Sequence, residues 1–423
     1  MQCTHRLFKL KMLAVAVLAA QGVSFEAAAA PACKLITAAR VFDGINPPQT
    51  NKSVLVVGDK VQQVGNFDAL KGQCASQLNL GDATILPGFI ESHAHVTFQN
   101  VRKDAVLEHG ITTVQDTGGP LLPPQGGNGT LRLLSTGPII QAQGGYPLNV
   151  FSTDGIGGYD KIGVNIADNA TENQVKQVVI DLINGGATAI KIALESGGEA
   201  GAPWMMPHGA APVPPNGGSW PILSLQHVQW IVQQAHLMGK RVIAHVGEDI
   251  GFARALDGGV DELAHMPCAA IASALLEEAV HSGTVTFVTT ADTLASCPGI
   301  HANMHGIAHI LEHHSGEIPY PFIYGSEVAH DNVPWGINGE ELHAMLHMTS
   351  GTAIDFGDVM NVMTSATGKA GARLGIPGLG TLTPNAPADL IAVKGNPFER
   401  FKLLEYPDLV MSGGKLVVYK FTR

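Results

Sequence analysis

The chain has 423 residues, a net charge of −11 and 14% charged side chains, against about 25% in typical soluble proteins. The acidic balance and the lack of a basic stripe argue against a nucleic-acid partner. The length exceeds that of one small domain and suits a barrel with an appended domain, whose tight turns the 50 glycines would supply.

The N-terminus predicts an export signal over residues 1–30. Three basic residues precede the apolar run 12–20, and the alanines at 27–30 provide small residues for cleavage. The apolar run is too short to anchor the chain permanently in a bilayer, and a lipid anchor on Cys33 is an alternative. We therefore expect a periplasmic or secreted protein with no stable membrane insertion after the signal is removed.

Short strands and turns at both ends of the chain predict one small β-sandwich domain. Gly and Asp residues punctuate apolar runs of strand length, and the two ends share this texture. The strand-like runs are 35–37, 54–57, 61–64, 389–393 and 415–419. We expect the domain to comprise residues 31–86 and 381–423.

Residues 87–380 alternate apolar strand-like runs with helical patterns, which predicts an α/β fold of the parallel (β/α)8 TIM-barrel type. The expected strands are 89–96, 111–116, 132–142, 189–194, 241–246, 262–266, 284–290 and 322–327. The helical patterns include 171–184, 225–238, 270–281 and 339–348. Such barrels carry their chemistry at the C-terminal ends of the strands, so polar groups there become the candidates.

Four cysteines remain after the predicted signal, and export makes disulfides available to them. Cys33 and Cys74 fall in one predicted structural unit, and Cys268 and Cys297 fall in another. We expect the pairs Cys33–Cys74 and Cys268–Cys297, and four buried thiols are the alternative.

The segment 86–96 ends an apolar run with two histidines that are one residue apart. Positions i and i+2 of a strand face the same side, so His93 and His95 can direct both imidazoles to one point. Two converging neutral imidazoles suit a zinc-type cation. For the pair alone, two histidines on a polar strand face are the simpler explanation.

Four more predicted strands end in groups that could join the histidine pair: Lys191, His245, His265 and Glu327. Each has an ordinary explanation when taken singly, such as a hydrogen-bonded core histidine or a salt-bridged lysine. However, burying an unpaired ammonium costs several kcal/mol, so Lys191 needs a partner or a changed chemistry. The joint placement of all these groups at strand ends predicts a metal site.

The chain resembles the amidohydrolase superfamily over nearly all residues that follow the predicted signal. The segment PGFIESHAH at 87–95, the lysine strand, both later histidines and the closing segment 387–391 carry the resemblance. The chain is most similar to the branch of dipeptidases and amidases related to imidazolonepropionase, which includes Xaa-Pro dipeptidases.

The resemblance implies a centre of two divalent metal ions, with zinc as the first expectation. His93 and His95 would bind the more buried metal, and His245 and His265 would bind the second. Lys191 would be converted to N6-carboxylysine by CO₂ and would bridge the two metals.

The sequence departs from the family pattern on the last predicted strand. The usual residue there is an aspartate that binds metal and acts as the base, whereas this chain has Glu327. Glutamate keeps the carboxylate but extends it by one methylene, so we expect Glu327 to be both ligand and base. Asp331 is the substitute, and it would need a register shift.

Two further residues are candidates for substrate binding. Tyr146 follows paired glycines at a position where relatives often carry histidine. Its phenol would donate to a substrate carbonyl, or the ring would only pack at the rim. His330, beside Asp331, is the second candidate.

Histidines also recur every four residues at 301, 305, 309 and 313, and would form a stripe along a helix. The i, i+4 spacing can bind zinc. A solvated polar face explains the same pattern without a metal, and no glutamate completes an HExxH motif.

These observations and the resemblance predict an exported binuclear metal-dependent amidohydrolase that cleaves an amide bond of a dipeptide or N-acyl amino acid. A hydroxide between the metals would attack, and Glu327 would transfer the proton. The excursion 204–220, with a tryptophan at each end, favours an apolar or aromatic substrate group. A lactone or ester hydrolase on the same site is the close alternative, and a non-catalytic exported metal-binding barrel is the alternative from another class. The expected partner is a small-molecule substrate, and a homo-oligomer is left open.

Overall fold

The computed structural model describes residues 32–151, 162–199, 201–202, 218–314, 318–330, 332–351 and 353–421. The predicted signal, Asp331 and most of the excursion 204–220 lie outside these residues. Within them, no helix combines the length and the apolar character needed to cross a membrane.

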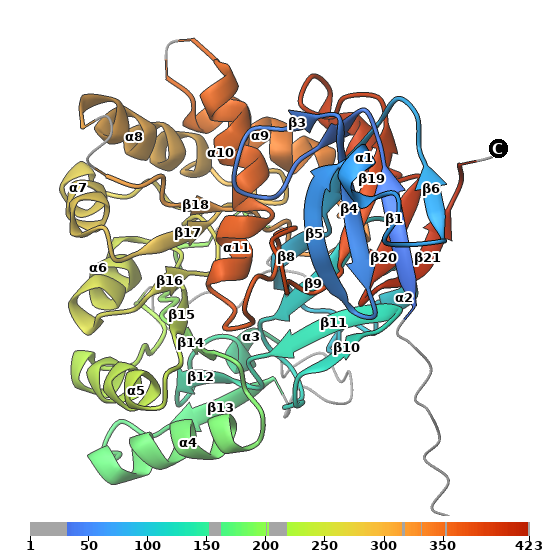
Figure 1. Cartoon of the computed structure of the whole chain (residues 1–423). Helices are drawn as coiled ribbons and strands as arrows, with labels where there is room; N and C mark the ends of the chain where they lie inside the picture. Colours follow the sequence, from blue (N-terminus) through green and yellow to red (C-terminus); the bar gives the residue numbers. More distant parts are fainter. Residues whose placement is uncertain are drawn as a thin grey trace, which may run out of the picture. The chain divides into compact units, whose positions relative to one another are not determined.

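Strands from both ends of the chain pair with each other in the β-rich part (Figure 1). One sheet has the order β5-β4-β1-β6 and the other has the order β21-β20-β19-β7-β2-β3. The first sheet and its short helix comprise β1 Cys33–Thr37, β4 Lys52–Val57, β5 Lys60–Asn66, α1 Phe67–Leu70 and β6 Gln77–Asn79. The second sheet comprises β2 Arg40–Val41, β3 Gln49–Thr50, β7 Ala83–Pro87, β19 Leu390–Lys394, β20 Leu409–Ser412 and β21 Lys415–Tyr419. Because β19 lies antiparallel to β7 from Pro87 to Ala83, the C-terminal strands adjoin the strand that leads into β8.

The rest of the described chain forms two further sheets, whose strands are parallel except for the β10–β11 hairpin. The order β10-β11-β9-β8 contains β8 Phe89–Ala94, β9 Ile111–Asp116, β10 Gln125–Gly127 and β11 Thr130–Ser135. The order β13-β12-β14-β15-β16-β17-β18 contains β12 Ile139–Ala142, β13 Gly163–Ile166, β14 Ile190–Ala193, β15 Val242–His245, β16 Glu262–Leu263, β17 Thr286–Val288 and β18 Phe322–Ile323.

Helices follow most of these parallel strands, and α4 to α8 line one side of the seven-stranded sheet (Figure 1). They are α2 Lys103–Glu108, α3 Leu148–Phe151, α4 Glu172–Asn184, α5 Leu225–Leu237, α6 Asp249–Gly258, α7 Ser273–Ser282, α8 Ile300–His313, α9 Gly339–Thr349, α10 Phe356–Ser365 and α11 Gly368–Ala372, with a 3₁₀ helix at Phe401–Glu405. The strand–helix alternation that the sequence predicts is therefore present.

The single strand expected at 132–142 is wrong, because the structure has two strands there in different sheets. β11 pairs with β9, whereas β12 pairs with β13 and β14. Gly137 between them has a φ of 70°, a conformation that L side chains rarely adopt. Pro138 cannot donate a ladder hydrogen bond, so the apolar run breaks at these two residues.

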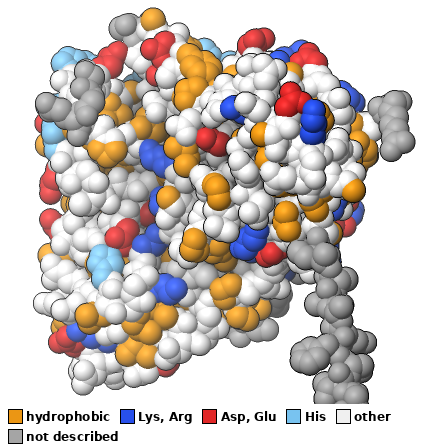
Figure 2. All heavy atoms as spheres, in the orientation of Figure 1, with side chains coloured by type: hydrophobic (Ala, Val, Ile, Leu, Met, Phe, Trp, Pro, Cys, Tyr) orange, Lys and Arg blue, Asp and Glu red, His pale blue; other side chains and the backbone are white. Residues whose placement is uncertain are grey.

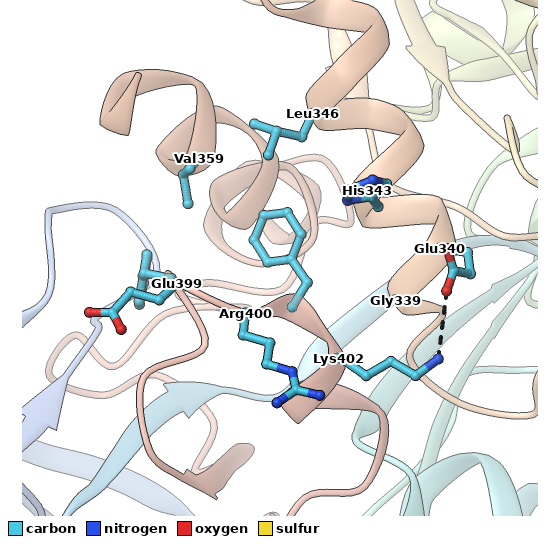
Figure 3. A pocket seen from close by; sticks show the side chains of 10 residues that line it. Gly339, Glu340, His343, Leu346, Val359, Glu399, Arg400 and Lys402 are labelled. Atoms are coloured by element: carbon cyan, nitrogen blue, oxygen red, sulfur yellow. Dashed lines mark ion pairs between the residues drawn. The ribbon is translucent and has the colours of Figure 1, made fainter. Parts of the chain in front are cut away.

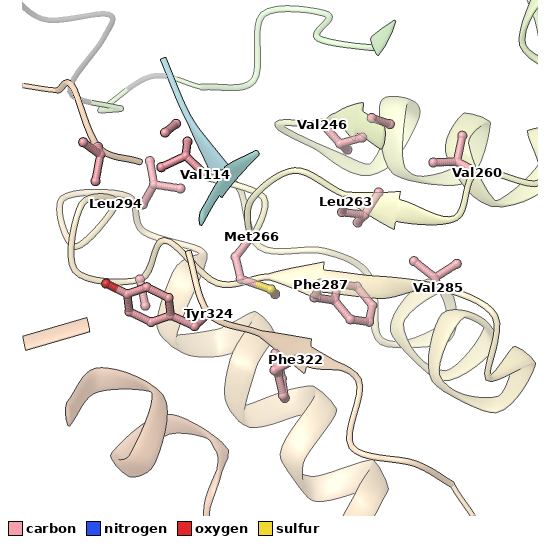
Figure 4. Packing of buried hydrophobic residues seen from close by; sticks show 14 of the residues in the cluster. Val114, Val246, Val260, Leu263, Met266, Val285, Phe287, Leu294, Phe322 and Tyr324 are labelled. Atoms are coloured by element: carbon pink, nitrogen blue, oxygen red, sulfur yellow. The ribbon is translucent and has the colours of Figure 1, made fainter. Parts of the chain in front are cut away.

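Apolar side chains fill the space between the seven-stranded sheet and its helices (Figure 4). Phe287 on β17 stacks on Phe252 of α6 at 6.4 Å and lies 6.0 Å from Phe322 of β18, measured between ring centroids. All three rings are fully buried, and burying each stabilises the fold by about 1.5–3 kcal/mol. These contacts pack α6 against β17 and β17 against β18.

A buried ion cluster lies near the starts of the parallel strands. Glu262, the first residue of β16, accepts a hydrogen bond from the guanidinium of Arg241 at 3.2 Å and also pairs with Arg373. Arg241 donates to the side-chain oxygen of Gln115 on β9 at 2.8 Å. The cluster thus ties β9, the start of β15 and the start of β16 together.

Both expected disulfides, Cys33–Cys74 and Cys268–Cys297, are formed, which confirms the predicted pairing. Cys268 lies in the loop after β16, three residues after His265. Its disulfide connects this loop to Cys297 in the turn before α8.

Candidate metal centre and active site

Two histidines and a glutamate form a group at the C-terminal ends of β8 and β18, in which His93 and Glu327 are buried and His95 is partly exposed. His93 lies within β8 and His95 follows it, with ring centroids 5.2 Å apart. The Nε2 atoms of both are 3.7 Å from Oε1 of Glu327. A tetrahedral zinc ion holds such ligand atoms about 3.4 Å apart, so these three side chains fit one metal.

Glu91 fixes the segment that carries Glu327. The Ser326 backbone N–H and hydroxyl donate to the Glu91 carboxyl group at 3.0 and 2.8 Å, and the His93 N–H donates to it at 2.9 Å. Burial raises the pKa of Glu91 to about 8. Glu91 was not among the predicted site residues. Alternation along a strand nevertheless places Glu91 on the same face as His93, two residues later.

Glu327 is held as a carboxylate among imidazoles. Its backbone has a φ of 59°, an uncommon conformation for a residue with a side chain. Nε2 of His330 lies 3.2 Å from Oε1 of Glu327. Burial alone would raise the pKa of Glu327, but His330 and the two ligand histidines hold it well below its usual range. His330 is thus brought to the site, whereas Asp331 lies outside the described residues.

A second buried group gathers His245, His265 and Glu199, whose donor atoms lie within 4.8 Å of one another. His245 ends β15, and its Nδ1 is 2.7 Å from Nε2 of His265. Oε1 of Glu199 is 2.9 Å from Nε2 of His245 and 3.9 Å from Nε2 of His265. The sequence analysis missed Glu199 because it lies in the loop beyond β14 and not at a strand end.

Burial keeps these imidazoles neutral, which is the form that binds metals. It places the pKa values of His93 and His245 well below their usual range, with the charge of Lys191 as the second cause. Burial, followed by the charge of His245, lowers the pKa of His265 to about 3.

Lys191 lies on β14, the strand that neighbours β15 of the second group, and is 1% exposed. Burial lowers the pKa of its ammonium to about 7, although the carboxylates of Glu327 and Glu199 oppose the shift. The neutral amine is therefore well populated at neutral pH. A neutral amine is the form that can add CO₂.

Both groups border one cavity of about 40 Å³. Its lining residues are His95, Phe98, Gln99, Gly118, Ile139, Tyr146, Pro147, Phe151, Ile162, Lys191, His245, Glu327 and His330. The lining combines metal-ligating residue types and Lys191 with aromatic and aliphatic side chains. The lining therefore places apolar side chains next to a polar centre.

Tyr146 stacks on His245 with ring centroids 4.4 Å apart, and the ring of Trp220 lies parallel to Tyr146 at 6.4 Å. Burial, with the charge of Glu199 as a second cause, raises the pKa of Tyr146 well above its usual range. The phenol therefore keeps its proton and can donate it. The ring also packs against His245, a candidate ligand, and is buried rather than placed at an exposed rim.

A larger hollow of about 430 Å³ lies elsewhere, between α9, α10 and the segment 398–402 (Figure 3). Its charged lining includes Lys402 and Glu340, which form an ion pair at 3.6 Å. Over the described part of the chain, the two groups above are the only ones in which three metal-ligating side chains converge. The small cavity is therefore the candidate active site.

Comparison with known proteins agrees with this assignment. A family model described as the Amidohydrolase family matches residues 84–417. No curated protein sequence is similar enough to the chain to count as a match.

Solved structures share the fold at low sequence identity. An ochratoxinase from A. niger is 18% identical, with 92% of this chain and 96% of that chain covered and a TM-score of 0.68. A Xaa-Pro dipeptidase with methionine in its active site is 21% identical, with coverages of 91% and 99% and a TM-score of 0.68. A prolidase in complex with N-methylphosphonate-L-proline is 18% identical, with coverages of 92% and 100% and a TM-score of 0.69.

Proposed function

Because the chain belongs to the amidohydrolase family, whose members are metal-dependent hydrolases, we propose that it is an exported binuclear enzyme that cleaves the amide bond of a dipeptide or an N-acyl amino acid. One observation carries the proposal. Two groups of neutral imidazoles, each with a carboxylate, border the same cavity as a buried lysine.

We further propose that the two parallel sheets close into a (β/α)8 barrel over residues 87–380, with residues 31–86 and 381–423 as the β domain. Hydrogen bonds between the sheets support this closure at both seams. The Thr188 N–H donates to the Ser135 carbonyl at 2.8 Å, and the His95 N–H donates to the Val328 carbonyl at 3.0 Å.

In this proposal His93, His95 and Glu327 hold one metal ion, and His245 and His265 hold the second. The nitrogen and oxygen donors and their spacing fit zinc. The neutral Lys191 amine would add CO₂ at Nζ and release one proton to solvent, and the resulting N6-carboxylysine would provide an anionic group for metal binding. This modification removes the cost of a buried ammonium.

The metals would supply Lewis-acid polarisation of the scissile carbonyl and would lower the pKa of water towards about 7. Glu327, held ionised by its histidine neighbours, accepts the proton of the attacking water and returns it to the leaving amine. His330 orients that carboxylate from 3.2 Å. The Tyr146 phenol donates to the substrate, and Phe98 and Ile139 exclude water from the apolar part of the cavity.

The experiment is a panel of dipeptides, N-acyl amino acids, esters and lactones, assayed on metal-free protein and on protein loaded with zinc, cobalt or manganese. We expect amide turnover only after metal is added. Turnover of lactones or esters alone would favour the alternative substrate class. A fully metal-loaded protein that turns over none of the panel would support a non-catalytic barrel. N-terminal sequencing of the exported protein tests the removal of residues 1–30.

A further inference from the structure

A hollow distinct from the candidate active site lies where the loop after β18 meets the start of α9 and the 3₁₀ helix. Its volume is about 490 Å³, within the range of about 300–1,000 Å³ that small-molecule sites occupy. It adjoins the hollow of about 430 Å³, since Glu340 and Lys402 line both (Figure 3). The described residues that line it include none of the candidate metal ligands.

Two large aromatic side chains line this hollow without being buried. Trp335 is 41% exposed and Tyr406 is 65% exposed. The ring of His109, a third lining residue, meets the Tyr406 ring edge-on at a centroid distance of 5.6 Å. Aromatic rings usually gain stability by burial, and exposed apolar groups that share one concave surface are typical of a binding site. We call this surface the aromatic hollow.

Carboxylates outnumber cations around these rings. Asp292, Glu340 and Glu405 line the aromatic hollow, whereas Lys402 is the only lysine or arginine among its described lining residues. Lys402 pairs with Glu405 at 3.0 Å and with Glu340 at 3.6 Å. On the face of the molecule in Figure 2, by contrast, acidic and basic side chains are interspersed. The aromatic hollow therefore combines exposed rings with an excess of negative charge.

Hydrogen bonds fix the backbone that follows Trp335. The Asn338 N–H donates to the phenol oxygen of the fully buried Tyr324 at 2.9 Å. The Asn338 side chain donates to the Asp292 carboxylate at 2.8 Å and accepts from the Glu340 N–H at 3.0 Å. A site that is already ordered loses little conformational entropy when a ligand binds, so the aromatic hollow is prepared for binding.

We propose that the aromatic hollow binds a small organic ammonium ion. A cation over an aromatic face is attracted by the ring quadrupole, and the unbalanced carboxylates add a Coulomb attraction that a neutral ligand lacks. An anionic ligand would be repelled by the same carboxylates. This binding site goes beyond the proposed amide hydrolysis and does not depend on it.

The test titrates choline into zinc-loaded protein and follows its N-methyl signal by ¹H NMR. The comparison ligand is the uncharged alcohol in which carbon replaces the choline nitrogen, and acetate is the anionic probe. We expect choline to bind about 5–30-fold more tightly than the alcohol, as two exposed cation–π contacts would give. Acetate should not bind.

Substitutions assign the binding to the aromatic hollow. Trp335→Ala and Tyr406→Ala should each weaken choline binding by about 2–5-fold. Lys402→Met should strengthen choline binding, because it releases two carboxylates from their ion pairs, whereas an anion site would lose affinity. Tyr419→Ala is the matched control, because Tyr419 is 44% exposed on β21 and is not among the lining residues. Melting temperatures check that each variant is folded.

The aromatic hollow is not an ammonium site if choline and the alcohol bind equally, or if choline does not bind saturably. The same conclusion follows if choline binding is unchanged in the double variant W335A/Y406A, or if Lys402→Met abolishes it. Binding of acetate that depends on Lys402 would assign an anion site instead. The readout is choline binding and not amide turnover, so a failure of the proposed function would leave this result unaffected.

Discussion

Replacing Glu262 with glutamine tests how much the buried ion cluster contributes to the stability of the fold. The Glu262 side chain is 1% exposed and pairs with the guanidinium groups of Arg241 and Arg373. Among the described residues, Glu262 is the only carboxylate that forms an ion pair with Arg241 or Arg373, and the substitution removes its charge. Breaking a buried ion pair by removing one partner costs about 3–5 kcal/mol.

The expected loss can be read as a change in melting temperature. The unfolding entropy of the 391 residues from Cys33 to Arg423 is about 0.8 kcal/mol/K at the average value per residue. A loss of 3–5 kcal/mol therefore lowers the melting temperature by about 4–6 °C, measured by differential scanning calorimetry.

Glu172→Gln is the control, because Glu172 forms a half-exposed i, i+4 pair with Lys176. Such a pair contributes about 0.3–0.5 kcal/mol, so the control melts within about 1 °C of the wild type. A Glu262→Gln protein that melts together with this control would refute the claim that the cluster anchors β15 and β16.

Three further predictions concern the site and its surroundings. Glu327→Gln should lower kcat by about 10²–10⁴-fold, because it removes the general base, and a wild-type kcat in the metal-loaded variant would contradict that role. Activation of metal-free protein by zinc and bicarbonate should fall as the pH drops through about 7, since the Lys191 amine, with a pKa of about 7, becomes an ammonium that cannot add CO₂. A pH-independent activation rate between pH 6 and 8 would count against carboxylation. The paired variant C268S/C297S should lose about 3–4 kcal/mol of unfolding free energy in denaturant titrations, as expected for a disulfide that closes a loop with a sequence separation of 29, and an unchanged midpoint would show that the bond adds no stability.

The sequence predicted the strand-borne part of the site because its signals are local. Alternation along a strand places His93 and His95 on one side, and an apolar run with an embedded lysine marks β14. The structure brings Lys191 to the same cavity as His245 and Glu327. Parallel strands direct their C-terminal ends to one side, so residues far apart in the chain could be grouped from pattern alone.

The parts that could not be predicted depend on loop paths and on breaks within apolar runs. Glu199 reaches His245 only because the loop after β14 folds back over the site, and no periodicity records such a path. Glu91 has the position of an ordinary strand residue until Ser326 is seen to donate to it. Gly137 and Pro138 interrupt the apolar run 132–142. Their backbone requirements end one strand and begin another.

The most direct measurement of the central claim is an anomalous difference map, collected at the zinc edge from crystals grown with zinc and bicarbonate. We expect two peaks, one among His93, His95 and Glu327 and one between His245 and His265. Continuous density should extend beyond Nζ of Lys191 to both peaks. A single peak, or density that ends at Nζ with both peaks present, would contradict the lysine-bridged binuclear centre.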